Sequence, residues 1–455
     1  MFLPRNDSER PIASVEELVQ SFHGWGKPRD QWLVGAEYEM IGVCTRDRDA
    51  PHAPMYAGDC GVEAILRALV EVGWEPIREG GHIIALARNN AQVTLEPGGQ
   101  LEHAMRPVRT ARVMESDATE YFGEIAGPSR AFGLAWLGVG FRPFGRLDDV
   151  PWMPKARYGI MRDYLPTRGA LAHEMMKRTA TVQVNLDYSD ADDARDKLRC
   201  LMSVTSLLTA IYANSSVVDG EVVDFQSYRS HIWTDTDPDR CGLLPLVFED
   251  GDIFRRYTEW ALDVPMFFVY RGGEHIPARG TTFRAFLRDG FAGHRATPDD
   301  WELHLSTLFP EARLKRFIEV RGCDAGSFGM NMALAPLTRG LLYDVTAREQ
   351  ATRLTEGLDM GERVELWHAV IRQGLRARVP RTGVRVLELA RELVRIADDG
   401  LSRYAPDDRY YLAPLKQVVD SGRTQADVLA DMWKQAGGAP RPLVEALSYP
   451  SLGGA

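Results

Sequence analysis

In the stretch Trp32-Leu33-Val34-Gly35-Ala36-Glu37-Tyr38-Glu39-Met40-Ile41-Gly42-Val43, two carboxylates lie within an otherwise apolar run. Side chains alternate between the faces of a strand, so a strand here puts Glu37 and Glu39 on the same face. The two acids would lie roughly 6–7 Å apart and, at an effective dielectric constant of about 20, would repel each other by roughly 2–3 kcal/mol. An apolar strand tolerates this pair when a cation lies between the charges, and we expect a metal ion there.

A second stretch, Gln92-Val93-Thr94-Leu95-Glu96-Pro97-Gly98-Gly99-Gln100-Leu101-Glu102, repeats the pattern. Its alternation predicts a strand whose polar face ends at Glu96, and Pro97-Gly98-Gly99 is typical of a tight turn that returns Glu102 towards Glu96. Any one of these acids alone would more often be a surface residue. Four of them in two apolar contexts favour a hard ion such as Mg²⁺ or Mn²⁺.

The composition is that of an ordinary globular protein and excludes several classes. The 455 residues could form two or three domains or one large one, and the net charge of −10 argues against nucleic acid or an anionic membrane as a partner. No apolar run reaches 18 residues, and residues 1–7 lack a signal-peptide pattern. The five scattered cysteines form no C-x-x-C pair, which suits a reducing cytoplasm, and we expect a cytoplasmic protein.

The organisation along the chain indicates an α+β fold. Strand-like alternation or apolar runs occur at 134–141, 181–187 and 314–320. After about residue 342 the apolar spacing becomes helical, over 345–358, 361–375 and 384–397. Strands scattered among helices, without regular βαβ spacing, favour α+β over a doubly wound sheet. We therefore expect a catalytic core at 1–342 and a mainly helical region at 343–455, packed on the core as one structural unit.

Two predicted strands offer further polar faces. The segment 181–187 places Gln183 and Asn185 on one face, where they could hold a metal, a phosphate or a ribose hydroxyl. A half-exposed antiparallel strand would show the same alternation with no functional role. The segment 314–320 places Glu319 and Arg321 on a common face.

Basic residues gather in two places. Residues 155–178 carry a local excess of positive charge that includes Arg157, and Arg binds carboxylate or phosphate at two points. A solvated helix face is the alternative for any one of them. If Tyr228-Arg229-Ser230-His231-Ile232-Trp233 is a strand, then Arg229, His231 and Trp233 share a face.

Common nucleotide signatures are missing. Gly24-Trp25-Gly26-Lys27 is followed by Pro and is not a phosphate-binding loop, and Gly138-Val139-Gly140 lacks the third small residue of a dinucleotide fingerprint. If the chain binds ATP, we expect it to do so through metals on a carboxylate-bearing sheet.

At these residues the chain resembles the plant-type glutamate–cysteine ligases, within the carboxylate–amine ligase superfamily related to glutamine synthetase. The resemblance covers roughly residues 30–342 and rests on colinear motifs. They are GAEYE (35–39), LEPGGQLE (95–102), MPKARY (153–158), TVQVNLD (181–187), RSHIWTDTD (229–237), LDVPM (262–266), WELHLST (301–307) and LKRFIEVRG (314–322).

The resemblance implies a curved antiparallel sheet with the active site on its concave face and helices packed around it. It also implies ATP-dependent γ-glutamyl amide formation: glutamate forms a γ-glutamyl phosphate, and the amine of cysteine displaces phosphate to give γ-glutamylcysteine, the first step of glutathione biosynthesis.

The same resemblance implies a role for each candidate residue. Two or three Mg²⁺ ions, with Mn²⁺ as a substitute, would be held by Glu37, Glu39, Glu96, Glu102 and Glu319. Gln183 and Asn185 would contact ATP or metal, and Arg321 would stabilise the transferring phosphoryl group. Substrate would be bound by Arg157, Arg229, His231 and Trp233. Arg229 would also have a catalytic role.

Some positions depart from the family pattern, which leaves alternatives open. Ala180 stands where a cysteine is expected, and Cys241 where a threonine is expected. The metal and ATP residues would look the same in a γ-glutamyl ligase acting on another amine, and a non-catalytic glutamate- or nucleotide-binding protein is a remoter alternative. We expect small-molecule substrates only, no nucleic acid or membrane partner, and a monomer or homodimer.

Overall fold

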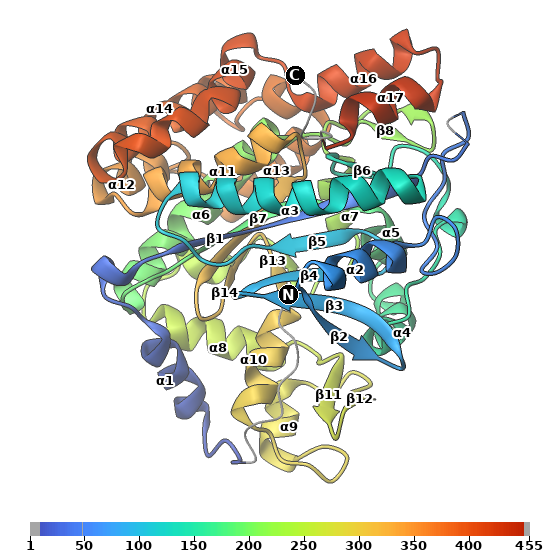
Figure 1. Ribbon diagram of the computed structural model, residues 1–455. Helices are drawn as coiled ribbons and strands as arrows, with labels where there is room; N and C mark the ends of the chain where they lie inside the picture. The colour runs from blue at the N-terminus through green and yellow to red at the C-terminus, as the bar shows by residue number, and fades with distance from the viewer. Residues whose placement is uncertain (1–9, 48, 450–455) are drawn as a thin grey trace.

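The computed structural model describes residues 10–47 and 49–449, and within them the dominant feature is one antiparallel sheet. Its strand order is β14-β15-β7-β1-β5-β4-β3-β2, and β6 pairs with the far end of β1 (Figure 1). The strands are β1 Val34–Cys44, β2 Glu75–Glu79, β3 His82–Arg88, β4 Ala91–Leu95, β5 Leu101–Ala104, β6 Leu134–Leu137, β7 Thr181–Leu186, β14 Ala312–Leu314 and β15 Ile318–Asp324. Shorter pairs are β8 Val217–Val218 with β9 Glu221–Val222, β10 Cys241–Gly242 with β13 Phe309–Pro310, and β11 Phe268–Arg271 with β12 Glu274–Pro277. The predicted α+β class with an antiparallel sheet is confirmed.

Helices occupy most of the remaining chain. Those before the last third are α1 Val15–Trp25, α2 Val62–Glu71, α3 Ala111–Phe132, α4 Ala156–Tyr164, α5 Ala172–Arg178, α6 Ala191–Tyr212, α7 Tyr228–Trp233, α8 Ile253–Asp263, α9 Phe283–Asp289, α10 Pro298–Ser306 and α11 Phe328–Leu342. Those of the last third are α12 Val345–Arg353, α13 Met360–Gln373, α14 Val386–Tyr404, α15 Ala413–Ser421, α16 Gln425–Gln435 and α17 Pro440–Leu447. Figure 1 shows this last group, in orange and red, gathered at one end of the molecule and α8 to α10 at the opposite end.

The central strand β1 separates two environments. Ala36, Tyr38 and Met40 are fully buried in the main hydrophobic cluster, which also contains Val182 and Val184 of the neighbouring strand β7. Strand alternation directs Glu37 and Glu39 to the other face, as the sequence predicted. One face of the sheet is therefore packed against helices, and the other is left for polar side chains.

The predicted division near residue 342 falls between α11 and α12. Leu341 and Leu342 on one side and Ala347, Leu393 and Val394 on the other belong to the same hydrophobic cluster. We propose that the described part of the last third, residues 343–449, is packed on the core as part of one structural unit; residues 450–455 lie outside the described residues.

Two predicted strands differ from those observed. The strand expected at 134–141 stops at Leu137, because the next residues turn away to contact other loops. The segment 314–320 is not one strand but a hairpin, in which β14 and β15 pair Arg313 with Glu319. The turn that joins the two strands is Lys315-Arg316-Phe317. It contains no Gly or Pro, so the sequence did not indicate a turn there.

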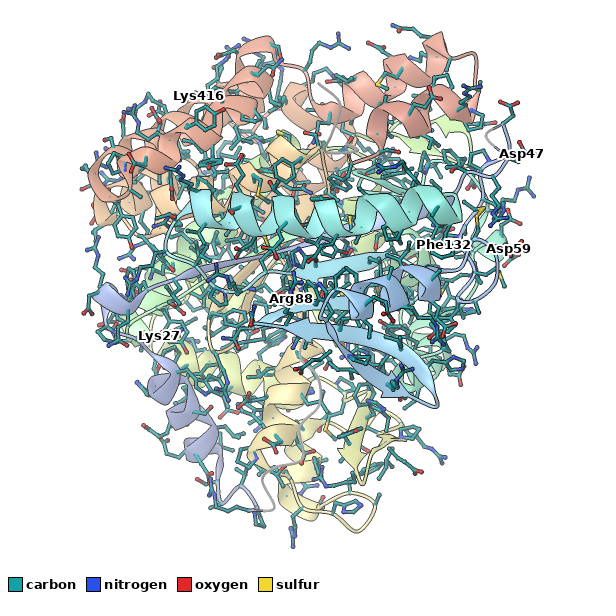
Figure 2. The ribbon with its side chains drawn as sticks, viewed as in Figure 1. Lys27, Asp47, Asp59, Arg88, Phe132 and Lys416 are labelled. Carbon is teal, nitrogen blue, oxygen red and sulfur yellow. A yellow bond between two sulfur atoms is a disulfide. The ribbon has the colours of Figure 1, made fainter. Side chains whose placement is uncertain are left out.

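The five cysteines, whose scatter suits a reducing cytoplasm, are not all free thiols. Cys44, the last residue of β1, forms a disulfide with Cys60, close to Phe132 and Asp59 at one edge of the molecule (Figure 2). The loop that follows β1 returns to it, and the Cys44 N–H donates to the carbonyl of His52 at 2.8 Å. This return, which sequence spacing does not reveal, brings the two thiols together.

Residues 1–7, in which no signal peptide is expected, lie outside the described residues. Among the described residues, no helix combines the length and apolar character needed to cross a membrane.

Candidate active site

Most of the predicted site residues line one cavity over the polar face of the sheet. The cavity is lined by Glu37, Glu39, Glu96, Glu102, Arg157, Gln183, Arg229, Trp233 and Arg321. These residues come from β1, β5, β7, β15, α4, α7 and the turn after β4, and so from segments up to about 280 residues apart in the chain. Three predicted residues, Asn185, Glu319 and His231, do not line it.

Strand register brings the carboxylates together. Glu39 of β1 lies directly opposite Glu102 of β5, and Glu37 lies opposite Gln183 of β7. Directly opposed side chains in an antiparallel pair have Cβ atoms about 4.5–5.5 Å apart, which is close for two acids. Asn185, beneath the cavity, donates from Nδ2 to Glu37 Oε1 at 2.7 Å.

The carboxyl group of Glu39 lies close to two other acids, Glu96 and Glu102. Desolvation in the cavity, together with the negative charges of Glu102 and Glu96, raises the pKa of Glu39 well above its usual value, and Arg229 and Arg321 offset this only in part. Burial and the charge of Glu102 likewise raise the pKa of Glu96. Partly buried carboxylates that repel one another are a donor set that suits a divalent cation.

The carboxylates do not form a ready-made cage. In the part of the chain that the structure describes, no three acidic, histidine or cysteine side chains meet closely enough to hold an ion by themselves. Mg²⁺ in phosphoryl-transfer sites is usually held by one or two carboxylates together with substrate phosphates and water. The donor set fits that open kind of site.

The turn that presents Glu96 requires both of its glycines. Gly99 has a φ of 84°, in the left-handed region that favours glycine, and a Cβ on Gly98 would lie 2.1 Å from the carbonyl oxygen of Lys177. The Gln100 side chain accepts from the Gly98 N–H at 2.9 Å and donates to the Thr179 carbonyl at 2.9 Å. The Pro-Gly-Gly sequence therefore allows the turn to lie directly on the segment after α5.

Glu319 has a different environment from the one expected of a metal ligand. It is fully buried beneath the cavity, where Arg313 donates to it with two nitrogens and Lys315 lies 2.8 Å from Oε2. Arg321 donates to it as well. Burial alone would favour the neutral acid, but these cations outweigh it and hold the pKa of Glu319 well below its usual value. A carboxylate already surrounded by three cations is poorly suited to bind a metal ion.

Arg321 connects this buried group to the cavity. Its Nη1 donates to Gln183 Oε1 at 2.6 Å and also to Glu319. Arg321 is thus held from below while its guanidinium lines the cavity beside Glu37 and Glu39. The pairing of Glu319 with Arg321 expected from the sequence is present, with the carboxylate serving as the partner of the cation.

Three buried donors, each on a side chain that lines the cavity, have no partner among the described residues. They are Nε of Arg157, Nε of Arg229 and Nε1 of Trp233. Buried N–H groups are almost always paired, and leaving one unpaired costs about 1–3 kcal/mol. Unpaired donors on two guanidinium groups and an indole mark a place where an anionic ligand would be bound.

The strand predicted for 228–233 is wrong: these residues form the short helix α7. The Ser227 hydroxyl accepts from the Ser230 N–H and caps the first turn, which starts a helix despite the β-branched and aromatic residues that follow. In a helix Arg229 and Trp233 lie on one face, with the guanidinium 5.9 Å from the indole ring. His231 points elsewhere and stacks on Phe225 at 4.4 Å, so it is not a substrate contact in this structure.

Sequence reasoning missed the apolar wall of the cavity. It is formed by Tyr158, Met161, Met175, Met176, Phe268 and Phe309. Met175 and Met176 lie on α5, within the basic segment 155–178 that was considered for its charge alone. No sequence signal separates such residues from ordinary core residues, because both are apolar side chains on amphipathic helices.

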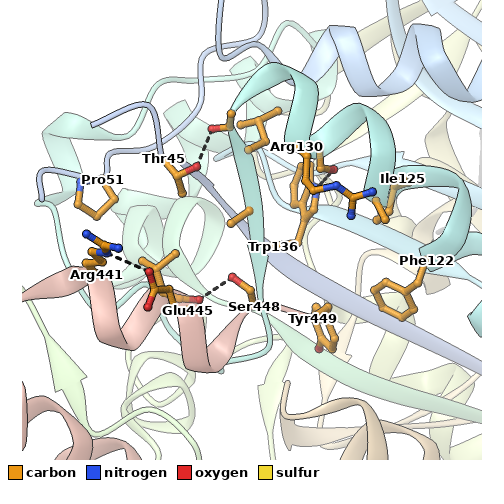
Figure 3. A pocket seen from close by; sticks show the side chains of 16 residues that line it. Thr45, Pro51, Phe122, Ile125, Arg130, Trp136, Arg441, Glu445, Ser448 and Tyr449 are labelled. Carbon is orange, nitrogen blue, oxygen red and sulfur yellow. Dashed lines mark hydrogen bonds and ion pairs between the residues drawn. The ribbon is translucent and has the colours of Figure 1, made fainter. Parts of the chain in front are cut away.

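A second cavity lies on the opposite side of β1, between α3, β6 and α17 (Figure 3). It is lined mainly by apolar side chains such as Phe122, Trp136 and Tyr449, and Phe122 stacks on Tyr38, whose side chain is on the face away from Glu37 and Glu39. The polar groups at its edge are largely satisfied, for example by the Arg441–Glu445 ion pair at 2.9 Å. It lacks the converging charges of the first cavity.

Comparison with known proteins shows what this chain is similar to. The chloroplastic glutamate–cysteine ligase of Brassica juncea is 36% identical over 95% of this chain and 84% of its own length. The chloroplastic enzyme of Arabidopsis thaliana is 36% identical over 95% of this chain and 83% of its own length. Among solved structures, glutamate–cysteine ligase from Francisella tularensis in complex with AMP has a TM-score of 0.55 at 12% identity, covering 92% of this chain and 90% of that one. At that identity the likeness shows the fold alone.

These relatives correct one prediction and settle another. The cytoplasmic location inferred from the scattered cysteines is contradicted, because the curated relatives are chloroplastic enzymes. The resemblance inferred from the motifs is confirmed and extends beyond them, since the model of glutamate-cysteine ligase family 2 matches residues 33–446. The chain belongs to glutamate-cysteine ligase family 2.

Proposed function

We propose that this protein is an ATP-dependent ligase that joins the γ-carboxyl group of glutamate to the amine of cysteine and yields γ-glutamylcysteine. Family membership supports the reaction class. The observation that carries the assignment to this cavity is the pairing of two opposite features: carboxylates with raised pKa values on one side, and buried, unpartnered cationic donors on the other. The first suits metal and nucleotide phosphates, and the second suits the carboxylates of glutamate.

The cationic side would bind and orient glutamate. Arg157 and Arg229 line the cavity, and the Nε of each has no partner among the described residues; Trp233 adds a neutral donor beside Arg229. Two guanidinium groups can hold a carboxylate at fixed geometry, which leaves the γ-carboxylate to be aligned for reaction. Positioning of this kind is the main contribution that a protein makes to phosphoryl transfer.

On the acidic side, two or three Mg²⁺ ions would be bound by Glu37, Glu39, Glu96 and Glu102. Mn²⁺ could take the place of Mg²⁺. When bound, the metal would neutralise charge on the ATP phosphates. Glu319 is better assigned to Arg321, which it keeps charged and oriented towards the cavity. Arg321 would then stabilise the transferring phosphoryl group.

The two steps pass through γ-glutamyl phosphate and require no covalent bond between substrate and protein. An oxygen of the glutamate γ-carboxylate forms a bond to the terminal phosphorus of ATP, and the bond from that phosphorus to the leaving ADP oxygen breaks. The amine of cysteine, after losing a proton, then forms the amide bond to the carbonyl carbon of the γ-carboxyl group, and the bond from that carbon to the phosphate oxygen breaks as inorganic phosphate leaves.

Cysteine is favoured as the acceptor by the apolar wall. Met161, Met175 and Met176 line the same cavity as several aromatic side chains. Because the methionine thioether is polarizable, this wall suits a small thiol side chain. The alternative acceptor, another small amine, would use the same metal and glutamate residues. We propose small-molecule substrates as the only reaction partners, with the protein working as a monomer or homodimer.

The test is phosphate release with ATP, Mg²⁺ and glutamate, with each amino acid added in turn. We expect cysteine to give the largest stimulation and γ-glutamylcysteine to be the product by mass spectrometry. Stimulation by another amine but not by cysteine would reassign the acceptor. No turnover with any amine, combined with measurable glutamate binding, would instead indicate a non-catalytic binding protein.

A further inference from the structure

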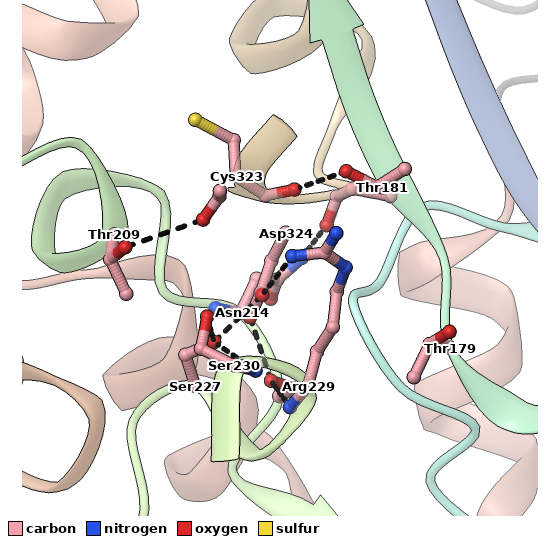
Figure 4. A network of polar contacts seen from close by, with 12 residues as sticks. Thr179, Thr181, Thr209, Asn214, Ser227, Arg229, Ser230, Cys323 and Asp324 are labelled. Atoms are coloured by element: carbon pink, nitrogen blue, oxygen red, sulfur yellow. Dashed lines mark hydrogen bonds and ion pairs between the residues drawn. The ribbon is translucent and has the colours of Figure 1, made fainter. Parts of the chain in front are cut away.

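Behind Arg229 lies a buried carboxylate that has no place in the reaction so far. Asp324, the last residue of β15, is 1% exposed and does not line the cavity. Its Oδ2 accepts from the Asn214 N–H at 2.9 Å and from the Ser215 hydroxyl at 2.7 Å, and its Oδ1 accepts from the Ser227 hydroxyl at 2.8 Å. Figure 4 shows these contacts around the end of α6 and the start of α7. The carboxylate is held rigidly by neutral donors on both oxygens.

Among the described residues, Arg229 is the one cation within 4.0 Å of this carboxylate. Its Nη1 lies 4.0 Å from Asp324 Oδ1, and its Nη2 donates to the Arg321 carbonyl at 3.0 Å. The backbone N–H of Arg229 donates to the Ser215 hydroxyl, which itself donates to Asp324. At 4.0 Å the pair interacts through charge and not through a hydrogen bond, yet both groups are more than 95% buried, where charge acts strongly.

The surrounding backbone is built to admit Asp324. A Cβ on Gly140 would lie 2.5–2.7 Å from the Asp324 carboxyl atoms, and a Cβ on Gly138 would lie 2.4 Å from the Gly326 carbonyl. The Gly138-Val139-Gly140 segment, which fails as a dinucleotide fingerprint, therefore provides close packing around this carboxylate. Asn214-Ser215 supplies the two donors that hold it from the other side.

We propose that Asp324 is the positioning residue of Arg229: it fixes the orientation in which the Arg229 side chain lines the cavity and its guanidinium binds a carboxylate of glutamate. This inference rests on the proposed function, in which Arg229 binds glutamate. In this geometry the Arg229 Nη1 lies nearest Asp324, Nη2 donates to a carbonyl, and Nε has no partner among the described residues. Without the charge of Asp324, one carbonyl would remain to orient the guanidinium.

The primary test is Asp324→Asn, measured by steady-state kinetics with glutamate and ATP varied separately. The variant keeps the size and most hydrogen bonds of the side chain but loses its charge. We expect the KM for glutamate to rise roughly tenfold or more, with kcat and the KM for ATP changed by less than about threefold, because binding of one substrate is weakened. A rise in glutamate KM of less than about threefold overturns the inference, whatever happens to kcat.

Two adjacent serines provide a matched pair in case Asp324→Asn does not fold. Ser215 donates to Asp324, whereas the next residue, Ser216, is equally buried but donates to the Ala426 carbonyl at 2.6 Å. We expect Ser215→Ala to raise the glutamate KM severalfold above that of Ser216→Ala. Equal KM values in the two variants overturn the inference even if both proteins lose thermal stability.

A double-mutant cycle with Arg229→Lys separates positioning from general damage. If Asp324 acts through the guanidinium, Asp324→Asn should add little to the glutamate KM once Arg229→Lys has removed it. Fully additive effects on KM would show that Asp324 acts by another route and would overturn the proposal.

Calorimetric titration of glutamate, with Mg²⁺ and a non-hydrolysable ATP analogue present, distinguishes the two possible failures. A wild-type protein that binds glutamate but makes no γ-glutamyl amide contradicts the ligase function and leaves the positioning role to be judged by the Asp324→Asn affinity. An active wild type together with unchanged glutamate affinity in Asp324→Asn contradicts the positioning role alone.

Discussion

Glu39 and Glu319 lie on the same face of the same sheet, on strands separated only by β7, yet their surroundings are opposite. Glu39 faces two other acids and has a raised pKa, whereas Glu319 is enclosed by Arg313, Lys315 and Arg321 and has a lowered pKa. The difference arises from which side chains the neighbouring strands place opposite each acid: Glu102 opposite Glu39, and Arg313 opposite Glu319. The cross-strand partner of each glutamate therefore contributes strongly to its different environment.

The strongest test of this comparison is Glu39→Gln. We expect turnover to be abolished, because the charge that would bind metal is lost, while the melting temperature stays the same or rises, because a repulsive charge is removed. Phosphate release and thermal denaturation measure the two effects. Full activity would remove Glu39 from the proposed metal site, and a large loss of stability would contradict the repulsion inferred around it.

The reverse outcome is expected for Glu319→Gln. Removing this carboxylate leaves three buried cations without their shared partner, and we expect the free energy of unfolding to fall by about 3–5 kcal/mol. Urea denaturation measures the change, with Glu39→Gln as the matched control, since both variants exchange a carboxylate for an amide on the same sheet face. Equal stability of the two variants would refute the contrast.

Lys315→Met gives a smaller and sharper effect. Lys315 contacts Glu319 but does not line the cavity, and Glu319 would keep Arg313 and Arg321. We expect stability to fall by about 1–3 kcal/mol with kcat within a few-fold of wild type. A severe loss of kcat at normal stability would contradict this expectation. It would mean that the charge balance around Glu319 affects the reaction, and not only the stability of the fold.

The smallest effect is a difference in pH dependence. The folded protein holds the proton of Glu39 more tightly than the unfolded chain does, so this residue lowers stability progressively as pH rises from the ordinary glutamate value through its raised folded pKa. Glu319 behaves oppositely: its stabilisation is present above the ordinary value and is lost as pH falls towards its lowered folded pKa.

This difference is measured with chelator present, as the melting temperature of Glu39→Gln minus that of wild type between pH 5 and pH 8. We expect the advantage of the variant to grow with pH. A difference that stays constant across this range would show that Glu39 carries no raised pKa. Adding Mg²⁺ should raise the melting temperature of wild type more than that of the variant.

Much of the candidate site could be predicted from local pattern. Alternation placed Glu37 and Glu39 on one face, and the Pro-Gly-Gly turn placed Glu96 near Glu102, because both depend on a few adjacent residues. Residues 228–233 could not be assigned in this way, since a single capping serine outside the apparent strand determined the helix. Cys44 and Cys60 paired because a loop returned to the end of β1, which spacing alone does not indicate.

The sequence by itself determined the family, the α+β class and the acids of the proposed metal site, because motif order and strand periodicity are properties of the chain. Tertiary structure alone decided that Glu319 also pairs with Arg313 and Lys315, that His231 turns away from the cavity and that Asp324 lies behind Arg229. These contacts join segments that are distant in the chain or lie across a turn, and strand register and helix packing choose among many possible partners for each charge. Alternation tells which face a side chain occupies, and only the assembled sheet shows what charge it meets there.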